Sequence, residues 1–306
     1  MDRSPTAAPV TRRPIVSPYT WIGLAVVAAT LGFLLTLAST PLPGAEEVTL
    51  EDGVDLACLL LFGVLGAELL RRGIAEGLGR ALLLLGILVA VNYLLAGIGD
   101  ALTNGHTPAP VGARLCSLGS QVAFLATFFL LIYAPLALFP TGRLPSPRWQ
   151  LLAWMPRLGV LAMAFSVLLA PGPVDEDNPA TGANPLGFDR LEGLSSALEI
   201  AGGVLLLLTT VGGLAAFVVR WVRYRGARRR QLAWLTAGVV TIVIGLVTNI
   251  EGSVVVEVAM ALAIFGTLLF GMAWPLLGPL GREINDNQTT VMQPSADPST
   301  PTTMHK

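Results

Sequence analysis

Eight long apolar runs restrict this chain to a small set of folds. They lie near residues 19–39, 54–72, 80–102, 114–139, 151–170, 194–219, 232–250 and 254–280. A helix of about 20 residues crosses the hydrocarbon core of a bilayer, where the backbone must satisfy its own hydrogen bonds. The runs lack the alternation of apolar and polar residues that is typical of membrane barrel strands. The sequence therefore predicts an all-α, polytopic integral membrane helix bundle with about eight transmembrane helices.

The predicted number of spans ranges from roughly six to eight. Only Glu251, Gly252 and Ser253 separate the seventh run from the eighth, and Arg157 interrupts the fifth. Hydrophobic residues make up 53% of the 306 residues and charged residues 13%, which leaves little material for a soluble domain. We therefore expect a helical membrane domain over residues 19–280, between disordered cytoplasmic segments at residues 1–18 and 281–306.

The positions of the basic residues favour one orientation of the bundle, because cytoplasmic loops retain Arg and Lys. With the N-terminus inside, only Arg114 and Arg190 fall in outer loops, and the outer segments 46–55 and 175–192 are acidic. The predicted inner set is Arg3, Arg12, Arg13, Arg71, Arg72, Arg80, Arg143, Arg148, Arg220, Arg223, Arg225, Arg228, Arg229, Arg230, Arg282 and Lys306. The sequence thus predicts a multi-pass protein of the plasma membrane with both termini in the cytoplasm.

Motifs for enzymatic chemistry are incomplete in this sequence. The string Gly97-Ile98-Gly99-Asp100 matches the GxGD pattern of intramembrane aspartyl proteases, which need a second aspartate to share a proton. Asp55 is the only other aspartate near a helix, and it lies at the outer edge of its run. Both histidines fall outside the runs, so a serine protease would lack its base, and His and Cys do not cluster at metal-ligand spacing. We expect no enzymatic activity, no cofactor and no nucleic-acid partner.

Polar side chains within the apolar runs are the remaining candidates for a site, because ionisable groups are costly there. These candidates are Glu68, Glu199, Glu257 and Asn249. Glu68 precedes Arg71 and Arg72 by three and four residues, a spacing that favours an interfacial ion pair on one helical face. Glu199 and Glu257 lie near the outer ends of their runs, where a ligand- or proton-sensing role stays open, whereas a transporter would need them near the midplane.

Small residues and arginines in the runs have simpler interpretations. The pairs Gly63 and Gly66, Gly202 and Gly203, and Gly212 and Gly213 predict helix faces that pack closely, and such faces also permit a homo-oligomer. The arginines between residues 220 and 230 are interpreted as topological anchors at the inner interface, with anionic lipid or a docked partner as the alternatives.

Four strings carry a resemblance to a known family. They are Val54-Asp55-Leu56-Ala57 with Arg71-Arg72, Leu138-Phe139-Pro140-Thr141-Gly142-Arg143-Leu144-Pro145-Ser146-Pro147-Arg148-Trp149, Asn184-Pro185-Leu186-Gly187, and Arg228-Arg229-Arg230-Gln231-Leu232-Ala233-Trp234-Leu235. In order and spacing they resemble the N-terminal membrane-sensor region of actinobacterial sensor histidine kinases, over roughly residues 20–275. The basic inner loops are the candidate docking face for a partner, with a docking set of Arg143, Arg148, Trp149, Arg228, Arg229, Arg230, Gln231 and Trp234. For the string from Leu138 to Trp149 the alternative is a tight loop anchored at the inner interface.

The resemblance does not extend to kinase chemistry. In that family the last span leads into a helix with a phosphoacceptor His and then an ATP-binding domain, and residues 281–306 contain neither. The leading hypothesis is a non-enzymatic sensor or scaffold module in the lipid bilayer that passes an envelope signal to a separate cytoplasmic kinase or regulator. One alternative is a small-solute or ion transporter that uses Glu199, Glu257 or Asn249, and another is a kinase-gene remnant.

Overall fold

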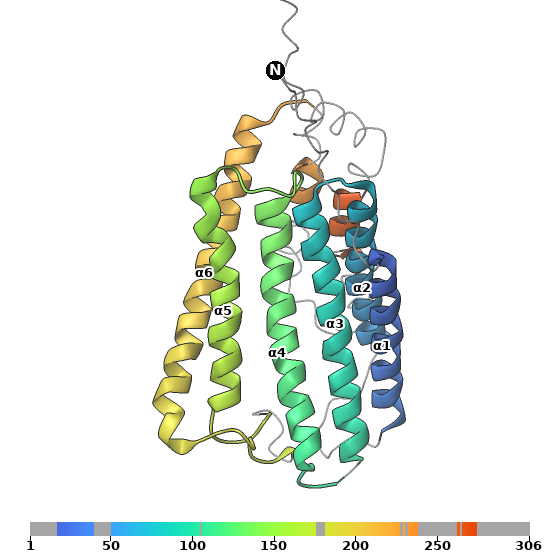
Figure 1. The fold of residues 1–306 in the computed structure, drawn as a ribbon, viewed down its shortest axis with the longest axis vertical. Coiled ribbons are helices and arrows are strands. Elements are labelled where there is room, and N and C mark those ends of the chain that lie inside the picture. The colour runs from blue at the N-terminus through green and yellow to red at the C-terminus, as the bar shows by residue number, and fades with distance from the viewer. Residues whose placement is uncertain are drawn as a thin grey trace, which may run out of the picture.

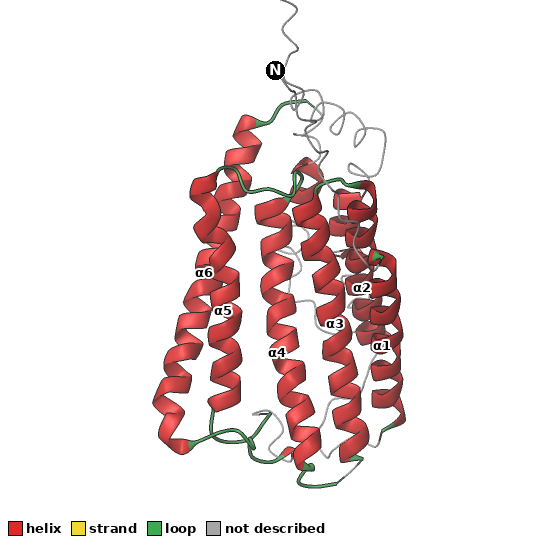
Figure 2. Ribbon diagram, in the orientation of Figure 1, coloured by secondary structure: helices red, strands yellow, loops and turns green. Residues whose placement is uncertain are grey.

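The computed structural model describes residues 17–39, 50–104, 106–175, 181–226, 229, 232–237, 262–263 and 265–273. Within these ranges the regular structure is helical, and the only β pairing is one isolated bridge between Pro173 and Ala183 (Figure 2). Six of the helices are long and apolar enough to cross a membrane. The prediction of an all-α bundle is therefore confirmed for the described part of the chain.

The six long helices run alternately up and down along the long axis of the molecule (Figure 1). They are α1 (Pro18–Ala38), α2 (Leu50–Arg72), α3 (Glu76–Thr103), α4 (Val111–Tyr133), α5 (Gln150–Leu169) and α6 (Glu192–Arg223). Shorter helical turns are η1 (Ala134–Leu138), η2 (Pro147–Trp149) and η4 (Asp189–Leu191). These helices correspond to the first six apolar runs, and the fifth run is a continuous helix through Arg157.

The seventh and eighth runs lie largely outside the described residues. Only Leu232–Ala237, residues 262–263 and residues 265–273 are described there, and they are helical. Phe265 packs edge to face against Phe62 of α2, with ring centroids 6.4 Å apart, and Leu268 and Met272 are buried in the same core cluster as α2 and α3. The described parts of these runs therefore pack on the bundle, while a count of eight spans stays a prediction.

Glycines let α3 act as the central helix, which packs on α1, α2 and α4. Gly97 lies directly against the backbone of Gly32 in α1, where a Cβ on either residue would overlap main-chain atoms of the facing helix. Toward α2, a Cβ at Gly63 would lie 3.0 Å from the Cα of Gly86. Such contacts bring backbones together and gain van der Waals energy, which drives helix association where no hydrophobic force acts.

A second group of close contacts joins α5 to α4 and to α6, and α6 to η1. At Gly159, Gly202 and Gly212, an added Cβ would lie too close to side chains of a neighbouring helix. Gly213 likewise faces Leu136. Of the glycine pairs predicted to pack closely, Gly203 is the exception, since nothing lies within 4 Å of its Cβ position. The prediction is confirmed for the other glycines of those pairs.

Asn184 closes the end of α5 within the loop that leads to α6. Its side-chain amide donates to the carbonyls of Val167, at 3.1 Å, and of Ala170, at 2.9 Å, while its side-chain oxygen accepts from the backbone N–H of Leu186 at 2.9 Å. The last carbonyls of a helix have no partner within the helix and must be satisfied from elsewhere. This contact gives the Asn184-Pro185-Leu186-Gly187 string a structural role.

The contact between α1 and α3 should depend on glycine. Gly97→Ala places a methyl group against the Gly32 backbone, and we expect it to lower the free energy of unfolding by about 1–3 kcal/mol through overpacking. Gly203→Ala is the matched control, because its site is open. Unfolding in mixed detergent micelles would measure both variants, and equal stabilities would contradict the close contact.

Candidate functional site

Charged side chains divide the bundle into a basic end and an acidic end. The alternating helix directions bring the end of α2, the start of α3, the α4–α5 connection and the end of α6 together at the basic end. Its described arginines are Arg71, Arg72, Arg80, Arg143, Arg148, Arg220, Arg223, Arg225 and Arg229. The opposite end holds Asp52, Asp55, Asp100, Asp175, Asp189 and Glu192, together with Arg114 and Arg190.

The α4–α5 connection, residues 139–149, folds back onto the α2–α3 turn. It begins after the π-helix η1, which contains Pro135 near its start, a residue with no amide hydrogen for a regular helical bond. Gly142 has φ of +70°, a conformation that favours glycine, and its backbone lies against Ala75 and Gly77. Ala75 itself is left-handed, with φ of +47°. The two turns therefore support each other through their backbones.

Arg220 of α6 fastens this connection to the bundle. Its side chain is 2% exposed, and its guanidinium donates to the carbonyls of Leu136, at 3.1 Å, of Ala137, and of Arg143, at 2.9 Å. A planar guanidinium offers several N–H groups in a fixed fork, which suits it to carbonyls that leave a helix end in different directions. Arg220 thus supplies from α6 the hydrogen bonds that the end of η1 cannot make within its own helix.

The burial of Arg220 adds a structural role to its interpretation as a topological anchor, which stays a prediction. The side chain is buried because Gly213, Ala216 and Arg220 lie on one face of α6, spaced three and four residues apart, and this face packs on η1. The three-residue spacing of Gly213 and Ala216 is a signal for that packed face, whereas the charge of Arg220 gives no sign of the carbonyls that it binds. Arg223 and Arg225 are exposed, as anchors would be.

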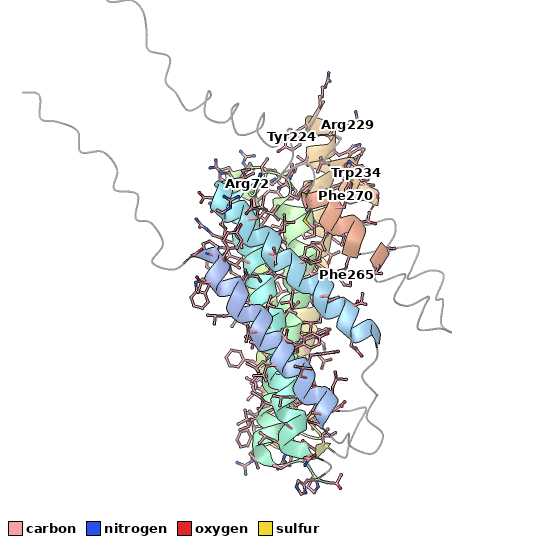
Figure 3. The ribbon with its side chains drawn as sticks, turned by 90° about the vertical axis from the view of Figure 1, so that its right-hand side faces the viewer. Arg72, Tyr224, Arg229, Trp234, Phe265 and Phe270 are labelled. Carbon is pink, nitrogen blue, oxygen red and sulfur yellow. The ribbon has the colours of Figure 1, made fainter. Side chains whose placement is uncertain are left out.

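The predicted docking residues are partly described. Arg143 and Arg148 are exposed at the basic end, whereas Trp149 is half-buried against the core. The Arg229 guanidinium lies 5.4 Å from the centre of the Trp221 ring, and Trp234 is 45% exposed beside Phe270. Figure 3 shows Arg229 and Trp234 near the same end of the molecule as Arg72. Outside the described residues lie Arg228, Arg230 and Gln231.

Glu68 forms the predicted ion pair and also gains a partner from another helix. Its carboxylate accepts from Arg71 and from Arg72, each at 2.5 Å, as well as from the Tyr19 hydroxyl in the first turn of α1. The Arg71 side chain also donates to the Tyr19 oxygen at 3.2 Å. The cluster therefore ties α1 to α2 at the basic end, and it leaves Glu68 no role as a free intramembrane carboxylate.

The other intramembrane candidates give little support to transport. Glu199 is exposed on α6, at one end of the uncharged stretch Ile200–Val219, which is about 30 Å long as a helix and so matches the hydrocarbon core. Glu257 and Asn249 lie outside the described residues. Asn92, a further polar residue, is used in packing, since its side-chain oxygen accepts from Ser120 of α4 at 2.7 Å.

The GxGD string has a packing role in this bundle. Gly97 contacts Gly32 of α1, and a Cβ at Gly99 would lie 3.3 Å from the carbonyl oxygen of Ala113 in α4. The Asp100 side chain forms a hydrogen bond with Thr36 of α1. Among the described residues, no group of three or more His, Cys, Asp or Glu side chains is arranged to hold a metal ion. The glycines of this string are explained by close contact on both sides of α3.

No protein family, curated protein or solved structure matches this chain. Over the residues that the structure describes, the chain forms a helix bundle with six helices that are long and apolar enough to cross a membrane.

Loss of the Arg220 side chain should release the α4–α5 connection. We expect Arg220→Met to lower the free energy of unfolding by at least about 2 kcal/mol, since hydrogen bonds to charged groups contribute roughly 1.5–3 kcal/mol each. Tryptic cleavage after Arg143 and Arg148 should become faster, which limited proteolysis in native membranes would measure.

Two further variants isolate the geometry of that contact. Arg220→Lys keeps the charge without the planar fork and should lie between wild type and Arg220→Met. Arg223→Met removes an exposed arginine three residues away and should cleave at the wild-type rate. Equal cleavage rates in Arg220→Met and wild type would show that Arg220 does not hold the connection.

The Tyr19 and Glu68 side chains should stabilise the bundle jointly. Tyr19→Phe removes the donor of this hydrogen bond and Glu68→Gln removes the charge of its acceptor, so a double-mutant cycle of detergent unfolding should give a favourable coupling. Glu76→Gln is the comparison, because the Glu76–Arg80 pair has side chains 60% and 72% exposed and should contribute little. Strict additivity of the Tyr19 and Glu68 changes would argue against the interhelical contact.

Proposed function

We propose that this protein is a non-enzymatic sensor or scaffold module of the plasma membrane, with both termini in the cytoplasm, which acts through a separate cytoplasmic partner. The separation of basic and acidic ends supports this orientation, because Arg is retained on the cytoplasmic side. The resemblance to histidine-kinase sensor regions supports the signalling role. In this proposal the acidic end faces the envelope and receives the signal.

The buried Arg220 is the observation that carries the proposal. It joins α6, which runs from the acidic end to the basic end, to the carbonyls of η1 and of Arg143. A displacement of α6 at the acidic end would therefore be transmitted to the α4–α5 connection as well as to the segment that follows α6. Packed helices move as units, because a close-packed interior resists gradual deformation.

The basic end offers a suitable surface for a partner. Arg143 and Arg148 are exposed on a connection whose backbone is fixed by Arg220 and by the packing of Gly142 on Ala75. A fixed backbone reduces the entropy lost on binding, and exposed arginines favour an acidic partner surface by steering its approach. The proposed partner is therefore a cytoplasmic protein with an acidic docking face.

Capture of the partner from native membranes tests the proposal. The tagged full-length protein would be treated with a mild crosslinker, purified and analysed by mass spectrometry. We expect a cytoplasmic protein, such as a kinase core or a response regulator, to be enriched with wild type and reduced several-fold with the double variant Arg143→Gln and Arg148→Gln.

Arg80→Gln is the matched control, because Arg80 is exposed at the same end but lies on α3 rather than on the α4–α5 connection. It should retain the partner. Enrichment of the same proteins from all three samples, or of none from wild type, would count against docking at the α4–α5 connection.

A further inference from the structure

Arg157 is a charged side chain on the outward face of an apolar helix. It lies in α5, where its neighbours on that face are also exposed and apolar, with Leu158 49%, Leu161 53% and Phe165 53% exposed. Its guanidinium carbon lies 5.1 Å from the centre of the Trp154 ring, one turn earlier, and that ring is itself 56% exposed. The Arg157 and Trp154 pair is therefore a polar group on a face of α5 whose other exposed side chains are apolar, as lipid-facing side chains are.

The Arg157 guanidinium has no acceptor among the described residues. It forms neither an ion pair nor a hydrogen bond there, although an arginine carries five N–H groups. Stacking on an aromatic ring uses the face of the guanidinium and leaves its N–H edge free. In an apolar environment unsatisfied donors are costly, so an acceptor from outside the described chain is needed.

The depth of Arg157 identifies the kind of acceptor. Arg157 lies seven residues beyond Gln150, the first residue of α5, which is about 10 Å along the helix axis from the basic end. Helical side chains lean toward the N-terminus of their helix, and the stacking on Trp154 shows that Arg157 leans this way. The long Arg157 side chain therefore extends toward the membrane interface at the basic end, where the phosphate groups of phospholipids lie.

We propose that Arg157 and Trp154 form a binding site for the phosphate of an anionic phospholipid on the lipid-facing side of α5. The guanidinium edge would donate to two phosphate oxygens, a charge-assisted pairing that the planar fork favours. The Trp154 ring would hold the guanidinium in place, and the glycerol backbone and acyl chains would lie along Leu158 and Leu161. A headgroup without its own ammonium group fits best, since none competes for the phosphate.

A second copy of the chain is a poorer occupant. In a side-by-side dimer, residues at equal depth meet, so the second copy would need an exposed carboxylate at the depth of Arg157. Gly159 of α5 packs near Leu205 of α6. Because the two helices run in opposite directions, Arg157 lies at the depth of the residues that follow Leu205. Of the two exposed carboxylates on α6, Glu199 is the nearer, and it lies about 12 Å further toward the acidic end, with Glu192 beyond it.

Lipid retention by the full-length protein tests this site. The protein would be reconstituted in nanodiscs that contain equal amounts of phosphatidylglycerol and phosphatidylcholine, extracted in mild detergent, and examined by native mass spectrometry for bound lipid. We expect wild type to retain phosphatidylglycerol in preference to phosphatidylcholine. Arg157→Gln should reduce the affinity for phosphatidylglycerol about tenfold, the effect of losing one charge-assisted pair.

Three comparisons make the result decisive. Arg80→Gln removes one exposed positive charge from the same end and should retain lipid as wild type does. Arg157→Lys keeps the charge without the fork and should bind with intermediate affinity, and circular dichroism would verify that each variant is folded. Trp154→Leu removes the stacked ring and should weaken binding less than Arg157→Gln.

Other outcomes would overturn the proposal. Equal retention of phosphatidylglycerol by wild type and Arg157→Gln would exclude the site, and equal retention of the two lipids by wild type would exclude a preference for anionic headgroups. If a protein copurifies with wild type and is lost from Arg157→Gln while bound lipid is unchanged, the occupant is an acidic helix of that protein.

Discussion

Helix carbonyls that lack a partner within their own helix are the constraint on which this bundle depends. In apolar surroundings such groups must be satisfied by protein, because water is not available to bind them. Arg220 meets this need for the end of η1, and Asn184 meets it for the end of α5. Arg220 lies 84 residues beyond Leu136, whereas Asn184 lies in the loop that leads from α5 to α6, so these hydrogen bonds also fix where the following segments lie.

The resemblance strings acquire a physical meaning from these contacts. The string from Leu138 to Trp149 contains Gly142, whose left-handed backbone packs on Ala75, and the carbonyl of Arg143, which Arg220 binds. The string from Asn184 to Gly187 contains the side chain that closes α5. Both strings thus specify helix ends and turns. The contacts of these residues therefore explain the architecture of the bundle, and they do not identify a ligand.

Much of the fold could be predicted from sequence, because apolar runs and three- or four-residue spacings are local signals. They placed α1–α6 and the Glu68 ion pair with Arg71 and Arg72. The partners of Arg220 and the contact of Tyr19 with Glu68 could not be predicted, since each depends on which helices become neighbours. Arg157 interrupts the fifth apolar run in the sequence, and the proposed lipid site rests on the surroundings of Arg157 in the folded chain.

The length of α6 has a geometric consequence for the protein in its bilayer. A helix of 32 residues is about 48 Å long, whereas the hydrocarbon core is about 30 Å thick. Figure 1 shows that α6 extends beyond the end of α5. The helix must therefore tilt or extend beyond the hydrocarbon core, so membrane thickness sets how far Arg223, its last residue, is held from the lipid surface.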